Sequence, residues 1–263
     1  MAYYSPSEIA IEFVNTGIRK TKTPFSRFAL LALLGGAFIA FGGLLSMAVA
    51  GGMPGVMGSN PGLLKFIFSS LFPVGLIMVS VAGADLFTSD CAYMTMPCLE
   101  RRISITALCK VLFLSYIFNF IGTQIVAYFF SYQTGIFSSD MYQSYLQHYA
   151  SAKINQDWYK VLVKGIGANW LVCLGTWMGY AAKDISGKAI GTWIPVMLFV
   201  TLGFEHSIAN MYFIPTAIYY GADISWVDFI VNNLIPATIG NIIGGGLLVG
   251  CAYWFVYLKD NRQ

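Results

Sequence analysis

A carboxylate and an imidazole stand side by side in an otherwise apolar stretch of the chain. Glu205 and His206 are the only charged or imidazole side chains in the 34 residues between Lys188 and Asp223. An ionisable group at membrane depth is costly, so it is by default a candidate functional residue. A neutral imidazole donates and accepts hydrogen bonds and titrates near neutrality, which makes His206 a candidate pore-lining group. Alternatively, Glu205 stabilises the backbone of a broken helix and His206 is its partner.

The first half of the chain contains a related segment. Gly83-Ala84-Asp85 matches Gly203-Phe204-Glu205 at an offset of 120 residues, and Thr88 supplies a hydroxyl shortly after the first of them. Two carboxylates facing a pore would repel an anion. We therefore expect Asp85, Glu205 and Asn210 to be structural, with the carboxylates accepting hydrogen bonds that hold broken helices in place.

The composition is that of an integral membrane protein. The chain is 57% hydrophobic and 10% charged, with a mean hydropathy of +0.66, whereas a soluble domain has about a quarter charged residues. Charge-free stretches are long enough for six membrane-spanning helices. The five cysteines are an odd number without a metal-ligand spacing, and they are interpreted as packing residues. No metal site, cofactor or nucleic-acid partner is predicted.

The spans repeat. Span 2 lies in the 34 residues between Lys65 and Glu100, and span 5 lies in the 34 residues between Lys188 and Asp223. A Gly-x-acid motif interrupts each of these two intervals. Asn119-Phe120-Ile121-Gly122 in span 3 also matches Asn241-Ile242-Ile243-Gly244 in span 6, at an offset of 122. The pattern indicates a duplication of three spans plus three. Matching interrupted spans in two halves point to a site near the bilayer midplane.

The lysines and arginines indicate the orientation. Eleven of the 15 lie on the side shared by both termini, loop 2–3 and loop 4–5. The positive-inside rule places that side in the cytoplasm, and an odd number of spans per half inverts the second half. Ser5-Pro6-Ser7-Glu8 predicts a capped N-terminal helix. The expected organisation is a cytoplasmic amphipathic helix in residues 1–26, a channel domain in residues 27–258 and a cytoplasmic tail in residues 259–263.

Broken spans place helix ends inside the membrane, where backbone amides and the helix dipole attract a small anion. Thr88 and His206 are expected to line such a pore. Apolar side chains surround them and favour a solute that is neutral or transiently neutralised: Phe72, Leu76, Leu86 and Phe199. Lys153, in the connection between the halves, is either an anion-attracting group or a solvated loop lysine. Asn169 is expected to bond either substrate or loop.

These motifs resemble a known family. Residues 83–89 and 203–211 are similar to the two signatures of formate/nitrite transporters, and residues 233–246 resemble the last span of that family. The resemblance covers residues 5–258. It implies an all-α membrane protein with an aquaporin-like six-transmembrane-helix fold, an inverted 3+3 repeat with broken helices 2 and 5. It further implies a homopentamer in the inner (cytoplasmic) membrane, with one pore per protomer.

The resemblance also implies roles for residues of this chain. Thr88 and His206 match the central polar pair, Leu76, Leu86, Phe199 and Phe72 match constrictions, and Lys153 and Asn169 match the anion-attracting lysine and the asparagine near the pore. The implied solutes are small monovalent anions such as formate, nitrite, acetate, lactate or hydrosulfide, carried passively or with protons.

Residues 94–98 and the short loop around Gly221 depart from the family pattern and leave the preferred anion open, with a hydrosulfide channel as the alternative. An intramembrane enzyme is the alternative from another class. The chain has two histidines and no His-Glu-x-x-His motif, and Ser207, adjacent to His206 on a helix, would not face it. A water or glycerol pore of aquaporin type would require paired Asn-Pro-Ala breaks, which the sequence lacks.

Overall fold

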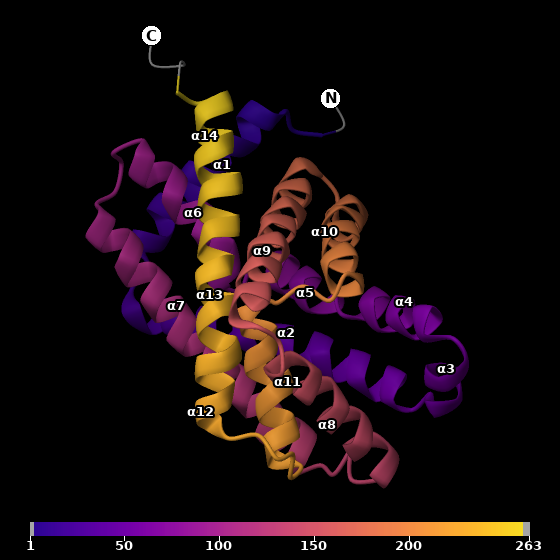
Figure 1. Ribbon diagram of the computed structural model, residues 1–263. Coiled ribbons are helices and arrows are strands. Elements are labelled where there is room, and N and C mark those ends of the chain that lie inside the picture. The colour runs from indigo at the N-terminus through magenta and orange to yellow at the C-terminus, as the bar shows by residue number, and fades with distance from the viewer. Residues whose placement is uncertain (1–2, 260–263) are drawn as a thin grey trace.

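The computed structural model describes residues 3–259, in which the regular elements are helices and an isolated bridge joins Tyr3 to Ala182. Both termini lie at one end of the molecule, while α8 (Asp140–Ile154) and α12 (Trp226–Asp228) lie at the other end (Figure 1). Of the predicted C-terminal tail, residues 260–263 lie outside the described residues.

The N-terminal helix α1 (Pro6–Lys22) forms as its capping motif predicts. The Ser5 backbone N–H donates to Glu8 at 2.7 Å, and the Ser5 hydroxyl oxygen accepts from the Glu8 N–H. One face of α1 is buried, and the Phe13 ring lies 4.6 Å from that of Tyr93 and 4.9 Å from that of Trp177. The other face is largely exposed and polar. Thr23 and Pro24 separate α1 from the first span.

Six spans follow α1, and two of them are broken. The first is α2 (Phe25–Gly51), followed by the short α3 (Pro54–Ser59). The remaining spans are built from the following elements: α4 (Pro61–Leu71), α5 (Val74–Ala82) and α6 (Phe87–Leu99); α7 (Ile105–Ile125) and η1 (Val126–Tyr132); α9 (Trp158–Ala181); α10 (Ile185–Thr201) and α11 (Ser207–Tyr219); and α12, η2 (Phe229–Leu234), α13 (Ile235–Ile242), η3 (Ile243–Cys251) and α14 (Ala252–Tyr257). Five continuous helical segments, in residues 25–51, 61–82, 105–132, 158–181 and 226–257, are each long and apolar enough to cross a membrane, and α10 is a shorter apolar helix.

The breaks occur where the sequence predicts them. Span 2 is interrupted between α5 and α6, and span 5 between α10 and α11. Gly83 and Gly203 have φ values of +82° and +67°, in the left-handed region where a side chain is strained. Each glycine therefore ends one half-helix, and a new 13-residue half-helix begins four residues later.

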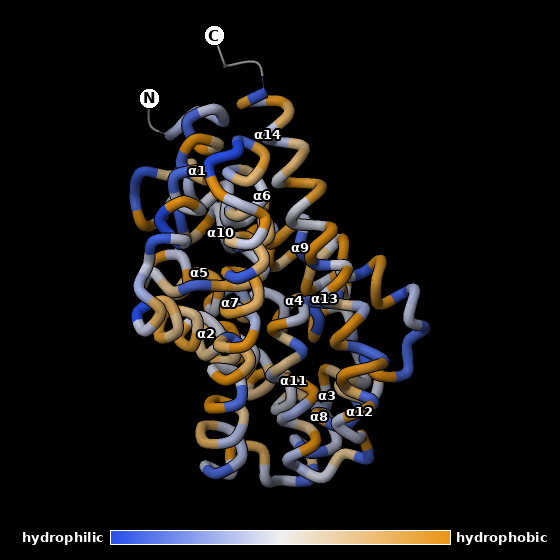
Figure 2. The backbone as a smooth tube through the Cα atoms, turned by 90° about the vertical axis from the view of Figure 1, so that its left-hand side faces the viewer, coloured by the Kyte–Doolittle hydropathy of each residue, from blue (hydrophilic) through white to orange (hydrophobic). Residues whose placement is uncertain are grey.

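The two halves pack by the same rule. Small residues let α2 and α7 approach so closely that a Cβ on Gly36 would lie 2.0 Å from the Asn119 carbonyl oxygen. In the second half, α9 meets the last span at Gly244, where a Cβ would lie 2.2 Å from the Ile166 carbonyl oxygen. The duplicated pairs place the two breaks against each other. Large apolar side chains such as Phe113 and Phe129 are exposed, as a lipid-facing surface requires. Hydrophobic residues, drawn in orange, recur along the helices of the backbone (Figure 2).

Candidate functional site

Thr88 and His206 meet in the interior, although 118 positions separate them in the chain. The Thr88 Oγ1 lies 3.0 Å from the His206 Nε2, and both side chains are at most 2% exposed. The His206 Nδ1 accepts the Ala209 backbone N–H at 3.0 Å. A neutral imidazole carries one hydrogen, so the hydrogen is on Nε2 and is donated to the Thr88 oxygen. The Thr88 O–H is left as a donor.

A pair of asparagines holds the backbone of both breaks. At the first, Asn119 Oδ1 accepts from the Phe87 N–H at 2.9 Å, and its Nδ2 donates to the Asp85 carbonyl at 3.0 Å. At the second, Asn241 Oδ1 accepts from the Ser207 N–H at 2.8 Å, and its Nδ2 donates to the Glu205 carbonyl at 2.9 Å. Non-helical backbone at membrane depth requires such partners.

Glu205, one of the residues predicted to be structural, bonds through its side chain to other side chains and not to the backbone of the break. Glu205 is 1% exposed and accepts from Lys153 at 2.9 Å and from Asn210 at 2.7 Å. Gln156 donates to Oε1 of Glu205 at 2.8 Å. Asn233 donates to Oε2 of Glu205, the oxygen that also accepts from Lys153, at 3.3 Å. Glu205 thus bonds to neighbouring helices instead of to His206. Lys153 is 8% exposed on α8, so the interpretation as a solvated loop lysine was wrong.

Asp85 lies in a different charge cluster. Ser115 of α7 donates to Asp85 at 2.9 Å, and Lys20 of α1 forms an ion pair with it. Lys20 also lies 2.7 Å from Asp90 of α6. Burial alone would lower the pKa of Lys20, but the two carboxylates outweigh burial and raise it. Sequence reasoning missed this ion-pair partner because Lys20 belongs to a separate amphipathic helix.

Asn169 bonds to the backbone at the breaks. Its Nδ2 donates to the Thr88 carbonyl at 3.0 Å and to the Asn241 carbonyl at 2.6 Å. The Cys173 thiol donates to the same Thr88 carbonyl at 3.3 Å. Both carbonyls belong to helices, α6 and α13, so the expected bond to a loop was wrong, and the expected bond to substrate stays a prediction. This contact fixes α6 at the residue that carries the candidate hydroxyl.

The four side chains predicted to form constrictions are each at most 2% exposed: Phe72, Leu76, Leu86 and Phe199. The Phe199 ring stacks on His206 with centroids 5.8 Å apart, and Phe72 meets Phe199 at 6.2 Å. Only a cavity of about 20 Å³ remains beside Phe72, Phe199 and His206. A space of this size holds about one water molecule, so a hydrated ion does not fit there.

Larger cavities lie on the α8 side and on the α1 side. Toward α8, a cavity of about 420 Å³ is lined by Lys65, Lys153, Lys164 and Glu205. Toward α1, a cavity of about 220 Å³ is lined by Lys20, Leu86 and Ser89 among others.

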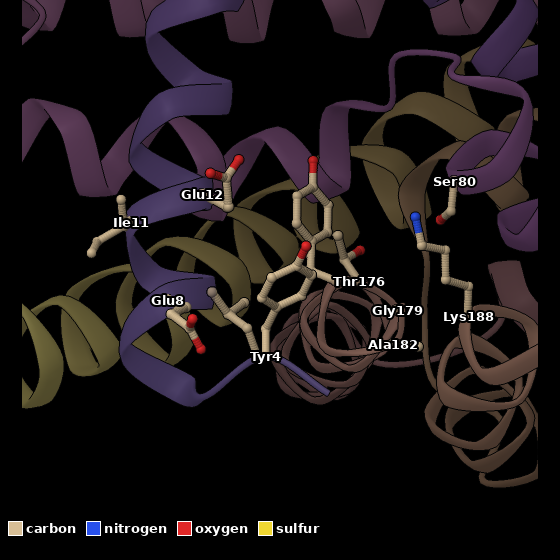
Figure 3. Close-up of a pocket in the computed structure, with 11 residues that line it drawn as sticks. Tyr4, Glu8, Ile11, Glu12, Ser80, Thr176, Gly179, Ala182 and Lys188 are labelled. Atoms are coloured by element: carbon tan, nitrogen blue, oxygen red, sulfur yellow. The ribbon is translucent and has the colours of Figure 1, made fainter. Parts of the chain in front are cut away.

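A further cavity of about 460 Å³ lies on the α1 side (Figure 3). Glu8 and Glu12 of α1, together with Lys188 of α10, contribute its charged side chains. Cavities therefore lie both on the α1 side and on the α8 side of the molecule.

Comparison with known proteins agrees with this architecture. The sequence profile described as "Formate/nitrite transporter" matches residues 7–255. The chain belongs to the formate/nitrite transporter family. It is 41% identical to a "Probable formate transporter" of Methanothermobacter thermautotrophicus, with 98% of this chain and 99% of the relative covered. It is 36% identical to "Formate channel BtFdhC" of Bacillus thuringiensis, with 100% and 99% covered.

A solved structure described as "Pentameric formate channel with formate bound" superposes with a TM-score of 0.78 at 31% identity, covering 89% of this chain and 98% of that one. The predicted six-helix fold with its inverted repeat is confirmed. Membership in a transporter family also rejects the intramembrane-enzyme alternative.

Proposed function

We propose that this formate/nitrite transporter family member is a channel for small monovalent weak-acid anions, with formate as the first substrate to test. The observation that carries the proposal is a buried hydroxyl–imidazole pair beside buried apolar side chains, with cavities on both the α8 side and the α1 side. A dry, narrow path passes a neutral acid far more readily than a hydrated ion. Relatives named formate transporter and formate channel support the choice of formate.

The anion enters from the α8 side, near Lys153, and reaches the half-helices that begin at Phe87 and Ser207. The N-terminal ends of α6 and α11 favour negative charge. Thr88 then donates its free O–H to the anion, because its oxygen is already occupied as the acceptor of the His206 Nε2–H. The hydrogen bond and a proton together remove the charge that the constrictions exclude.

The proton comes from solution as hydronium, which reaches the anion through the cavities and leaves a water molecule behind. Neutral His206 has only the Nε2 hydrogen to give, and its Nδ1 is occupied by the Ala209 N–H. Losing the Nε2 hydrogen would leave an imidazolate, and gaining one at Nδ1 would break the bond to Ala209. His206 is therefore a positioning residue that orients the Thr88 hydroxyl, and a formate anion plus a proton cross as formic acid.

We extend the proposal to assembly and orientation. The solved relative is described as pentameric, and exposed apolar side chains on the spans offer surface both to lipid and to further copies. A homopentamer with one pore per protomer follows. The excess of lysine and arginine on the α1 side supports an orientation in the inner membrane with both termini in the cytoplasm.

Flux into proteoliposomes tests the function. Formate, nitrite, hydrosulfide and chloride are compared at several pH values. We expect the weak-acid anions to pass, chloride to be excluded, and uptake to rise as the pH falls. A ranking with hydrosulfide first would replace formate as the substrate. Equal passage of all four anions without pH dependence would refute neutralisation in the constriction.

Two variants separate the roles in the pair. Thr88→Val should lower formate flux at least about tenfold, the cost of one lost hydrogen bond to a charged group. Thr95→Val on the same helix is the control, because its hydroxyl bonds to the Cys91 carbonyl. His206→Asn should lower flux but retain its pH dependence. Loss of that dependence would make His206 the proton donor.

A further inference from the structure

The cavity on the α8 side carries an unusual excess of positive charge. Lys65 of α4, Lys153 of α8 and Lys164 of α9 line it, with Glu205 as the carboxylate in the lining. His148 of α8 also lines the cavity. The apolar part of the wall includes Leu64, Phe68 and Val200.

The three lysines differ in their partners. The charge of Lys153 is balanced by Glu205 at 2.9 Å. Lys164 donates to the side-chain oxygen of Gln156, which is neutral, and within residues 3–259 no carboxylate lies within ion-pair distance of Lys164 or Lys65. The surplus positive charge of the cavity therefore belongs to Lys164 and Lys65.

Lys164 is built into the site more firmly than Lys65. It is half-buried, whereas Lys65 is exposed. The Oε1 of Gln156 accepts from Lys164 and its Nε2 donates to Glu205 at 2.8 Å, so Lys164 is held in a chain of hydrogen bonds that ends at the second helix break. An ammonium group has three donors. Gln156 uses one of them and leaves two for a ligand.

The opposite end of the path has no such surplus. The α1-side cavities contain Glu8, Glu12 and Lys188 in one case, and Lys20 with Asp85 in the other. Lys20 is balanced by Asp85 and Asp90. The two mouths of the protomer thus present different charges to an arriving anion.

We propose that Lys164 binds the substrate anion in the α8-side cavity before it enters the constriction, which gives this mouth a higher apparent affinity than the α1-side mouth. The apolar wall accommodates the C–H side of a small monocarboxylate while the ammonium group holds its oxygens. The inference rests on the proposed anion transport and adds to it a substrate site at a cation distinct from Lys153.

The test is initial formate uptake into intact cells that lack their own formate transport, measured over a range of external concentrations. Lys164→Gln should raise the half-saturation concentration roughly three- to tenfold, more than it lowers the maximal rate. Lys164→Arg should restore the wild-type value. Lys160→Gln is the matched control, because Lys160 is exposed one turn earlier on the same helix and pairs with Asp157 at 2.6 Å.

Charge can also be restored chemically at the same position. Lys164→Cys is treated from outside with a membrane-impermeant methanethiosulfonate that carries either trimethylammonium or sulfonate, alongside identically treated wild-type protein. The positive reagent should lower the half-saturation concentration and the negative reagent should raise it. Equal values with both reagents, or equal values for Lys164→Gln and Lys160→Gln, would overturn the site. Absence of formate uptake by the wild-type protein would instead refute the proposed function.

Discussion

The two helix breaks use the same backbone contacts but different ion pairs. In each, an asparagine of the next span accepts the N–H that starts the half-helix and donates to the carbonyl of the acidic residue. The same amide also donates to the neighbouring span, to Ala32 at 2.6 Å in the first half and to Gly165 at 2.8 Å in the second. The duplication thus preserved every hydrogen bond made by this side chain.

The charges around the breaks have diverged. Glu205 has one buried cation, Lys153, and neutral Asn210 lies five residues later. At the first break, Lys20 serves both Asp85 and Asp90, and Asp90 occupies the position that corresponds to Asn210. The second break therefore has one cation for one carboxylate, and the first has one cation for two.

Each break has two physical requirements, partners for its unpaired backbone and a counter-ion for its carboxylate. Unpaired backbone in the membrane costs several kcal/mol per group, so both breaks need the asparagine. A counter-ion can come from any element that reaches the carboxylate. The second break takes it from α8, which is inserted between spans, and the first takes it from α1, a surface helix. Loss of a charge should consequently have unequal effects on the two halves.

Glu205→Gln should have the largest effect. It keeps the shape of the side chain but leaves Lys153 buried without a negative partner, which costs about 3–5 kcal/mol. We expect a marked fall in the thermal midpoint of the detergent-solubilised protein, followed by intrinsic fluorescence. Combining it with Lys153→Met should recover most of the loss. Equal midpoints for the single and double variants would show that the ion pair does not stabilise the second break.

Asn119→Ala and Asn241→Ala should come next, and their effects should be equal. Each removes three buried hydrogen bonds at a break, an expected loss of roughly 2–4 kcal/mol. Thermal midpoints measured side by side test the equivalence. Asn232→Ala is the control, since this half-buried asparagine makes one contact of 3.4 Å to Asp228. A loss confined to one half would contradict the shared backbone solution.

Local sequence signals were sufficient to predict the two helix breaks and the proximity of Thr88 to His206. Gly-x-acid motifs in two apolar stretches predicted both interruptions, and the inverted repeat placed Thr88 close to His206. The repeated motif that contains Asn119 and Asn241 was identified in the sequence. That these asparagines hydrogen-bond the backbone of both breaks was not predicted. The signal was present, because a buried asparagine at the same position of both halves needs a partner.

The ion-pair partners could not be predicted from the sequence. Lys20 lies 65 positions from Asp85, and Lys153 lies 52 from Glu205, so each pair depends on how a connecting or terminal helix folds back on the spans. Hydrophobic pattern fixes the faces of such helices but not where their long charged side chains end. The unbalanced charge of Lys164 could not be predicted for the same reason, because Gln156 and Glu205 come close to Lys164 only in the folded chain.

Asp85→Asn should cost far less than Glu205→Gln. Lys20 keeps Asp90 at 2.7 Å as its counter-ion, and the new amide oxygen still accepts from Ser115. The expected loss is about 1 kcal/mol, the range of one exchanged hydrogen bond. Thermal midpoints of both variants, measured in the same detergent, give the ratio. A loss as large as that of Glu205→Gln would mean that Asp90 does not balance Lys20.

The smallest effect is expected at the start of α1. Glu8 accepts from the Ser5 hydroxyl and backbone N–H, and these bonds lower its pKa from the ordinary value of 4.5. A lowered pKa in the folded state means that the capping contribution is present above 4.5 and is lost as the pH falls through the lower value. Hydrogen exchange of the first-turn amides, corrected for intrinsic rates, should show this loss of protection below about pH 4.5. The middle of α1 is held by the ring contact between Phe13 and Tyr93, which does not titrate as a carboxylate does. Amides in the middle of α1 should therefore keep their protection from exchange at the same pH. Simultaneous loss of protection along the whole of α1 would instead mean that the helix unfolds as one cooperative unit together with the ion pairs of Lys20 at the first break.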